Sequence, residues 1–178
     1  QKGDNCILIY AGSNHEISES EVDACLSRFE PGDYLMLQNE INAVPYILEK
    51  AFERGLEIVF NPSPITEDLA AYPLDKVSIF VLNEIEGHCL SWKTEPNEIL
   101  TILHRRYPNA KIVLTLGEKG SIYFDGTEKV VQDIYKVNAV DTTAAGDTFT
   151  GYLIAGFAAG KSPKSAMQSA SIAAGIAA

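Results

Sequence analysis

The feature that most constrains the fold of this chain is a series of short apolar runs that alternate with amphipathic segments. Four such runs are apolar on both of their faces: 34–38, 56–60, 77–82 and 111–116. Strands that are buried on both faces and alternate with helices are typical of a parallel sheet covered by helices on both sides. The sequence therefore predicts an α/β fold with three layers, α/β/α, around a mainly parallel sheet.

The segments between and after these runs predict the remaining elements. Helical spacing of apolar residues appears at 19–29, 46–54 and 96–106, and a further helical segment runs through Cys89. Asn42 is the expected N-cap of the second helix, with Pro45 in its first turn. After Gly117, the short runs "SIYFDG" and "KVVQDIYKV", joined through "DGTE", predict a β-hairpin. The last forty or so residues read as Ala/Gly-rich helix.

The beginning and the end of the sequence suggest a piece of a longer protein. The chain starts at Gln1 with a short apolar run, 6–12, and it stops inside a small-residue helical pattern that has no capping signal behind it. We expect further residues on both sides.

Composition excludes several classes of protein. With 14 Lys and Arg against 24 Asp and Glu, the net charge of −10 opposes binding to nucleic acid or to an anionic membrane. No apolar stretch approaches the ~18 residues of a membrane span, and the first residues lack the layout of a signal peptide. The three cysteines are scattered, which favours reduced thiols over a disulfide framework or a zinc site. A cytoplasmic protein with small-molecule partners is the expectation.

Polar residues gather at the carboxyl ends of the predicted strands, where ligands bind in open parallel sheets. A single case would be an ordinary strand end, but four strands share the feature. The residues are Gln38, Asn39 and Glu40, then Asn61, then Asn83, Glu84 and Glu86, and finally Thr115 and Gly117.

The stretch "DTTAAGDTFTG" (141–151) opens a predicted helix near Ala145. Unpaired N–H groups and the positive end of the dipole at such a helix start suit an anion, for example a phosphoryl group in transfer. Gly146 and the two alanines before it would let that anion approach the backbone. Asp147 either complements the dipole or orients a substrate hydroxyl and accepts its proton.

Other suggestive patterns have simpler interpretations. "GFAAGKS" (156–162) has one residue too few between its glycines for a phosphate-binding P-loop, and Gly160 reads as the end of a helix. The small residues from Gly151 to Gly156 indicate helix packing. His15, His88 and His104 have no spacing that suggests a metal site.

These motifs together resemble a known family. The stretch 141–151 is similar to the C-terminal signature of the ribokinase-like carbohydrate kinases, also called the phosphofructokinase-B family. The motifs "LQNE" (37–40), "NPSP" (61–64), "NEIE" (83–86) and "TLGEKG" (115–120) follow in the family's order. The resemblance implies a remnant of a β lid at residues 1–14, followed by a truncated nucleotide-binding and catalytic domain at 15–178.

The resemblance also implies a role for each matched residue. Asp147 would be the catalytic base, and the backbone of Ala144, Ala145 and Gly146 would form an anion hole for the γ-phosphate. The nucleotide would be bordered by Asn83, Thr115, Gly117 and Gly120, and Glu86 would act on Mg²⁺ through water. Glu40 would contact the sugar. Asp141 and Thr143 match a loop that holds an activating monovalent cation such as K⁺.

The activity that the resemblance implies is ATP-dependent phosphorylation of a sugar hydroxyl, with D-ribose as the first expectation. A kinase for fructose, 2-keto-3-deoxygluconate or a nucleoside is the alternative, and so is a non-catalytic sugar or nucleotide sensor on the same fold. ATP and Mg²⁺ are the implied cofactors, and a homodimer of the intact protein stays open. Because the family's main sugar-binding motif is absent, we expect little or no kinase activity from these 178 residues alone.

Overall fold

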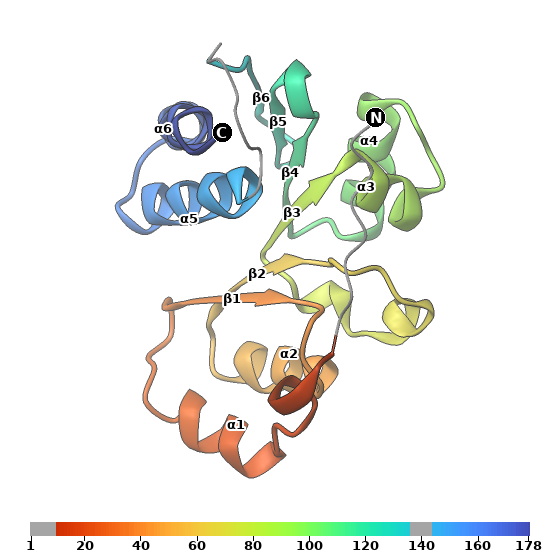
Figure 1. Ribbon diagram of the computed structural model, residues 1–178, viewed down its shortest axis with the longest axis vertical. Coiled ribbons are helices and arrows are strands. Elements are labelled where there is room, and N and C mark those ends of the chain that lie inside the picture. Colours follow the sequence, from red (N-terminus) through yellow and green to blue (C-terminus); the bar gives the residue numbers. More distant parts are fainter. Residues whose placement is uncertain (1–9, 136–143) are drawn as a thin grey trace.

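The computed structural model describes residues 10–135 and 144–178, and its strands form one sheet (Figure 1). The six strands lie in sequence order: β1 (Tyr34–Gln38), β2 (Glu57–Asn61), β3 (Ile79–Asn83), β4 (Lys111–Thr115), β5 (Ser121–Phe124) and β6 (Lys129–Gln132). Strands β1 to β4 are parallel, whereas β5 runs antiparallel to both β4 and β6. The mainly parallel sheet and the hairpin after Gly117 are thus confirmed.

Six α-helices accompany the sheet within the described residues. They are α1 (Glu19–Leu26), α2 (Val44–Glu53), α3 (Glu84–Ser91), α4 (Pro96–Arg106), α5 (Ala145–Ala158) and α6 (Pro163–Ala177). Short 3₁₀ turns occur at η1 (Gly12–His15), η2 (Glu67–Ala71), η3 (Leu74–Lys76) and η4 (Gly117–Lys119). The helix predicted for 96–106 is confirmed at both ends, while the one predicted for 19–29 already ends at Leu26.

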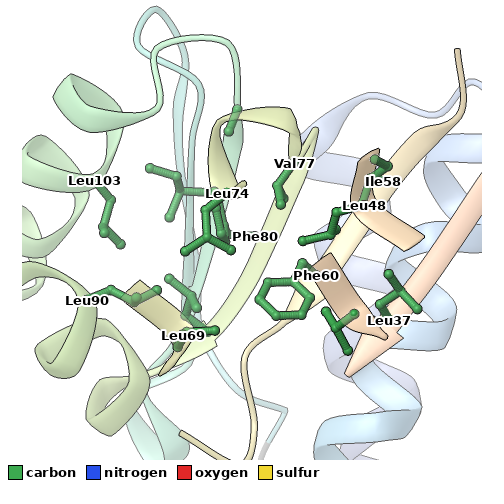
Figure 2. Packing of buried hydrophobic residues seen from close by; sticks show 14 of the residues in the cluster. Leu37, Leu48, Ile58, Phe60, Leu69, Leu74, Val77, Phe80, Leu90 and Leu103 are labelled. Carbon is green, nitrogen blue, oxygen red and sulfur yellow. The ribbon is translucent and has the colours of Figure 1, made fainter. Parts of the chain in front are cut away.

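The two faces of the sheet bury two separate apolar clusters, which makes the three predicted layers. Alternate residues of each central strand face opposite ways: in β2, Ile58 and Phe60 join the larger cluster and Val59 joins the smaller one. The larger cluster packs against α1 to α4 and the 3₁₀ turns η2 and η3, and Figure 2 shows part of it around Phe60 and Phe80. The smaller cluster packs against α5 and α6, which lie together beside β3 to β6 in Figure 1.

The predictions for the N-terminus are mostly untested. Residues 1–9, which carry most of the apolar run at 6–12 and of the expected lid remnant, lie outside the described residues. Within residues 10–15 the structure has the 3₁₀ turn η1. The division of the chain at residue 14 remains a prediction.

The prediction that Asn42 caps α2 is wrong. The N-cap is Ala43, which takes the left-handed conformation with φ 60°, and Pro45 lies in the first turn as expected. The Asn42 amide instead binds the backbone of Ile17, accepting from its N–H at 3.1 Å and donating to its carbonyl at 2.8 Å. Asn42 therefore ties the segment before α1 to the segment before α2.

The C-terminal end of α5 confirms the interpretation of Gly160. Gly160 has φ 71°, and the N–H groups of Gly160 and Lys161 donate to the carbonyls of Phe157 and Gly156. This pattern of two bonds is a Schellman motif, which closes a helix rather than cradling a phosphate.

The small residues of α5 serve helix packing at one position and not at another. A Cβ on Gly156 would lie 2.8 Å from the Cβ of Ala166, so this glycine allows α5 and α6 to approach each other closely. A Cβ on Gly151 would meet no atom within 4 Å. The prediction that small residues of α5 allow helix packing is therefore confirmed at Gly156, whereas no such packing is found at Gly151.

We predict that Gly156→Ala and Gly151→Ala have opposite effects on stability. The first should lower the free energy of unfolding by about 1–3 kcal/mol, because the methyl group overpacks the α5–α6 contact. The second should raise it by roughly 0.5–1 kcal/mol, because alanine restricts the unfolded chain and meets open space. Urea denaturation of both variants measures the difference, and equal effects would contradict the close contact at Gly156.

Candidate functional site

The carboxyl ends of the strands form a row of polar residues, as the sequence predicts. Gln38 pairs with Asn61 across β1 and β2, and Asn83 pairs with Thr115 across β3 and β4. Ser121 of β5 lies opposite Thr115 and extends the row. Residues that are distant in the sequence therefore share one edge of the sheet.

The N-terminus of α5 lies at this edge and is open. Ala144 is the N-cap, with φ 62°, and its methyl side chain can accept no hydrogen bond from the first turn. The first N–H groups of a helix have no acceptor within the helix, so they stay available for a ligand or water. A Cβ on Gly146 would meet no atom within 4 Å, which leaves space beside this backbone. The prediction that Ala144, Ala145 and Gly146 form an anion hole is compatible with this uncapped helix start and remains a prediction.

Asp147 is an exposed residue in the first turn of α5. Its Oδ1 accepts a hydrogen bond of 3.3 Å from Nε2 of Gln38, the last residue of β1. This contact joins the candidate base to the row of strand ends. The sequence analysis named Gln38 only among the polar strand ends. Alternation along β1 places Gln38 on the same face as Tyr34 and Met36, and this was the sequence signal for the direction of its side chain.

Asn83 and Glu86 form a capping box at the start of α3, a role that the sequence analysis missed. The Asn83 side chain accepts from the Glu86 N–H, while its own amide and backbone N–H donate to Glu86 Oε1 and Oε2, each at 2.8 Å. The pattern N-x-x-E before a helix was the sequence signal for it. Burial raises the pKa of the Glu86 carboxyl, and the hydrogen bonds from Asn83 oppose that shift.

Thr115, Gly117 and Gly120 lie next to this box, at the end of β4. Thr115 donates through Oγ1 to the carbonyl of Leu82, and Gly117 has φ +56° with open space where a Cβ would be. Gly120 has a structural reason to be glycine, because a Cβ there would lie 2.1 Å from the carbonyl oxygen of Gln132. Of these two glycines, only Gly117 has open space where a Cβ would be.

Glu40 stands in the loop after β1 and is exposed. Within the part of the chain that the structure describes, its carboxylate takes part in no hydrogen bond or ion pair. The neighbouring Asn39 is buried, and its amide donates to the Pro64 carbonyl and to Thr66 Oγ1. Asn39 thus ties the loop that carries Glu40 to the loop after β2, a role that the sequence analysis did not assign.

The predicted monovalent-cation residues, Asp141 and Thr143, lie outside the described residues. Among residues 10–135 and 144–178, no group of three or more His, Cys, Asp or Glu side chains could hold a metal ion. No helix in these ranges is long and apolar enough to cross a membrane.

The comparison with protein families decides the family. The family model described as pfkB family carbohydrate kinase matches residues 1–178. The chain belongs to this family. The pfkB membership confirms the resemblance carried by the motifs at 37–40, 61–64, 83–86, 115–120 and 141–151.

Individual relatives within the pfkB family are sugar kinases. The chain is 30% identical over 177 residues to a ribokinase of Bacillus subtilis (strain 168), with 98% of this chain and 58% of that protein covered. It is 29% identical over 153 residues to a deoxyribokinase of Salmonella typhi, with 83% of this chain and 50% of that protein covered. The chain therefore spans between half and three-fifths of the length of these relatives.

A solved structure agrees with the fold. The ribokinase of Arabidopsis thaliana complexed with ribose and ATP matches with a TM-score of 0.79 and 25% identity, covering 98% of this chain and 59% of that one. The ribokinase-like three-layer architecture is thus shown.

We predict that Glu86→Gln is nearly neutral for stability, whereas Glu86→Ala is not. Burial raises the pKa of Glu86 above its usual value of 4.5, so at pH 7 the ionised carboxylate costs free energy in the folded state. Glutamine removes this cost and loses one hydrogen bond. The free energy of unfolding at pH 7 should change by less than about 1 kcal/mol for Glu86→Gln and fall by about 1–3 kcal/mol for Glu86→Ala.

Urea denaturation at pH 7 measures both changes. Glu84→Gln, an exposed position in the same first turn whose carboxylate lies 3.8 Å from Lys119 Nζ, is the control. Equal losses in Glu86→Gln and Glu86→Ala would contradict the assigned burial cost.

Proposed function

We propose that this chain is the nucleotide-binding and catalytic part of an ATP-dependent sugar kinase that transfers the γ-phosphoryl group to a hydroxyl of D-ribose. The observation that carries the proposal is the open start of α5, where free backbone and the space beside Gly146 adjoin the exposed Asp147 at the carboxyl edge of the sheet. The ribokinases among the relatives support ribose as the sugar.

In this proposal the backbone and Asp147 have separate tasks. The N–H groups at Ala144 to Gly146 stabilise the negative charge on the phosphoryl oxygens during transfer. Asp147 holds the sugar hydroxyl in line with the phosphorus and accepts its proton through a carboxylate oxygen. Glu40, exposed in the loop after β1, contacts the sugar.

The capping box borders the nucleotide, with Thr115 and Gly117 beside it. Each Glu86 oxygen accepts one hydrogen bond from Asn83 and retains acceptor capacity, which suits contact with the water shell of Mg²⁺ rather than direct ligation. When bound, Mg²⁺ neutralises charge on the nucleotide phosphates. Gly120 shapes the same loop through its packing on Gln132. An activating monovalent cation at Asp141 and Thr143 belongs to the same proposal.

A second sugar is favoured by one observation. The deoxyribokinase relative is about as similar to this chain as the ribokinase, so 2-deoxy-D-ribose is the alternative substrate. The two sugars differ by one hydroxyl. In our proposal, residues outside this chain take part in distinguishing them. Assays therefore use the complete protein and compare D-ribose, 2-deoxy-D-ribose and D-fructose.

We predict that Asp147→Asn lowers kcat by about 10²- to 10⁴-fold, because the amide cannot accept the hydroxyl proton. The KM for ATP should change little, since Asp147 has no assigned contact with the nucleotide. Asp75→Asn, an exposed aspartate in η3 before the amino end of β3, is the control and should have wild-type kinetics. Unchanged turnover in Asp147→Asn would exclude the role of base, whereas no turnover of any sugar by the complete wild-type protein would favour the non-catalytic sensor.

We predict that Gly146→Ala separates activity from stability. Because a Cβ meets no protein atom there, the variant should fold at least as well as the wild type, as should Gly151→Ala. Only Gly146→Ala should lower kcat, by about 10²-fold, because its methyl group occupies the approach to the anion hole. Thermal melting and steady-state kinetics of both variants provide the test, and full activity in Gly146→Ala would place the phosphate elsewhere.

A further inference from the structure

The contact between Gln38 and Asp147 crosses 109 positions of the sequence and joins the sheet to α5. Nε2 of Gln38 lies 3.3 Å from Oδ1 of Asp147. Between described residues this is the only side-chain hydrogen bond that either group makes. A carboxylate has no proton to donate, so the NH₂ group of the amide must face it.

Both partners stand on rigid elements. Leu37, the neighbour of Gln38, is buried in the larger cluster, and the backbone of Gln38 lies in register with Asn61 of β2. Gln38 therefore points to the other face of β1, toward α5. Asp147 is followed in α5 by Phe149 and Leu153, which are buried in the smaller cluster. The two buried clusters thus fix the backbone positions from which the amide and the carboxylate reach each other.

The chemistry of this pair suits the orientation of a base. The donor on Oδ1 limits rotation of the carboxylate, and no group among residues 10–135 and 144–178 donates to Oδ2, which can therefore accept from a hydroxyl. A neutral amide donates a hydrogen bond to the carboxylate, whereas a second carboxylate at position 38 would have no proton to donate and would repel it. Gln38 is half-buried and Asp147 is exposed, so the free oxygen remains accessible to a substrate.

We infer that Gln38 is a positioning residue for the phosphoryl transfer: its amide holds Oδ1 of Asp147 so that Oδ2 meets the sugar hydroxyl. This inference rests on the proposed function, because it assigns Gln38 a role only through Asp147 as the base.

The test uses the complete protein with ATP, Mg²⁺ and the preferred sugar. Gln38→Met keeps the length of the side chain and removes the donor, so kcat should fall by about 10-fold while the KM for ATP and the melting temperature stay unchanged. Gln38→Glu keeps the shape and adds a second carboxylate, so its kcat should fall further. The control is Gln168→Met, the same exchange in α6, where the amide donates to Tyr135 OH at 3.0 Å.

A double-mutant cycle with Asp147→Asn shows through which group Gln38 acts. If Gln38 acts through Asp147, adding Gln38→Met to Asp147→Asn should lower kcat by less than about 2-fold, measured with radiolabelled ATP. A full 10-fold additional loss would mean that Gln38 contacts the substrate independently, and it would overturn the inference. Wild-type kcat in Gln38→Met, with a large loss in Asp147→Asn, would overturn the inference alone. Wild-type turnover in Asp147→Asn would overturn the proposed role of Asp147 as base and the inference with it, and absence of turnover in the wild-type protein would overturn the proposed function.

Discussion

Burial of both faces of one parallel sheet is the constraint on which the rest of this structure depends. The strands follow one another in sequence order, and the segments that connect β1 to β4 pack in the single cluster around Phe60 and Phe80. Crossover connections between parallel strands are right-handed. When each new strand is added on the same side of the previous one, all of these connections therefore lie on one face of the sheet. The opposite face, with Val59 and Val113, is left for α5 and α6 to cover. Thus the last two helices complete the core.

The same constraint creates the site. Covering the second face brings the first turn of α5 to the carboxyl ends of the strands, where Asp147 meets Gln38. The row of strand ends supplies Asn83 and Thr115, which lie in register on the neighbouring strands. Apolar packing therefore brings Gln38 within hydrogen-bonding distance of Asp147 and places Asn83 beside Thr115. The pfkB family membership and the open space beside Gly146 both support our proposal that this edge binds the phosphoryl group.

Several residues show where local patterns are ambiguous. Asn42 has a side chain that is typical of an N-cap, but Ala43 takes the cap position. Asn42 instead binds the backbone of Ile17, which belongs to a distant segment of the sequence. Asn83 and Glu86 were assigned to the nucleotide and prove to be a capping box as well. Gly120 looks like a nucleotide-loop glycine, yet its close approach to Gln132 is a sufficient reason for it. For Asn42 and Gly120 the structural partner comes from a distant part of the sequence, whereas the capping box of Asn83 and Glu86 has a local sequence signal.

The sequence by itself determined the layers, the parallel strands, the hairpin and the helix that begins at Ala145, because these follow from local periodicity and turn residues. It also placed Asp147 and Gly146 at a helix start and identified the family motifs. Only the tertiary structure decided that Gln38 contacts Asp147, that Asn39 ties two loops together, and that Gly156 packs on Ala166 while Gly146 and Gly151 face open space. These contacts join residues from separate elements, and their distances depend on how the apolar faces pack, which a one-dimensional pattern does not contain.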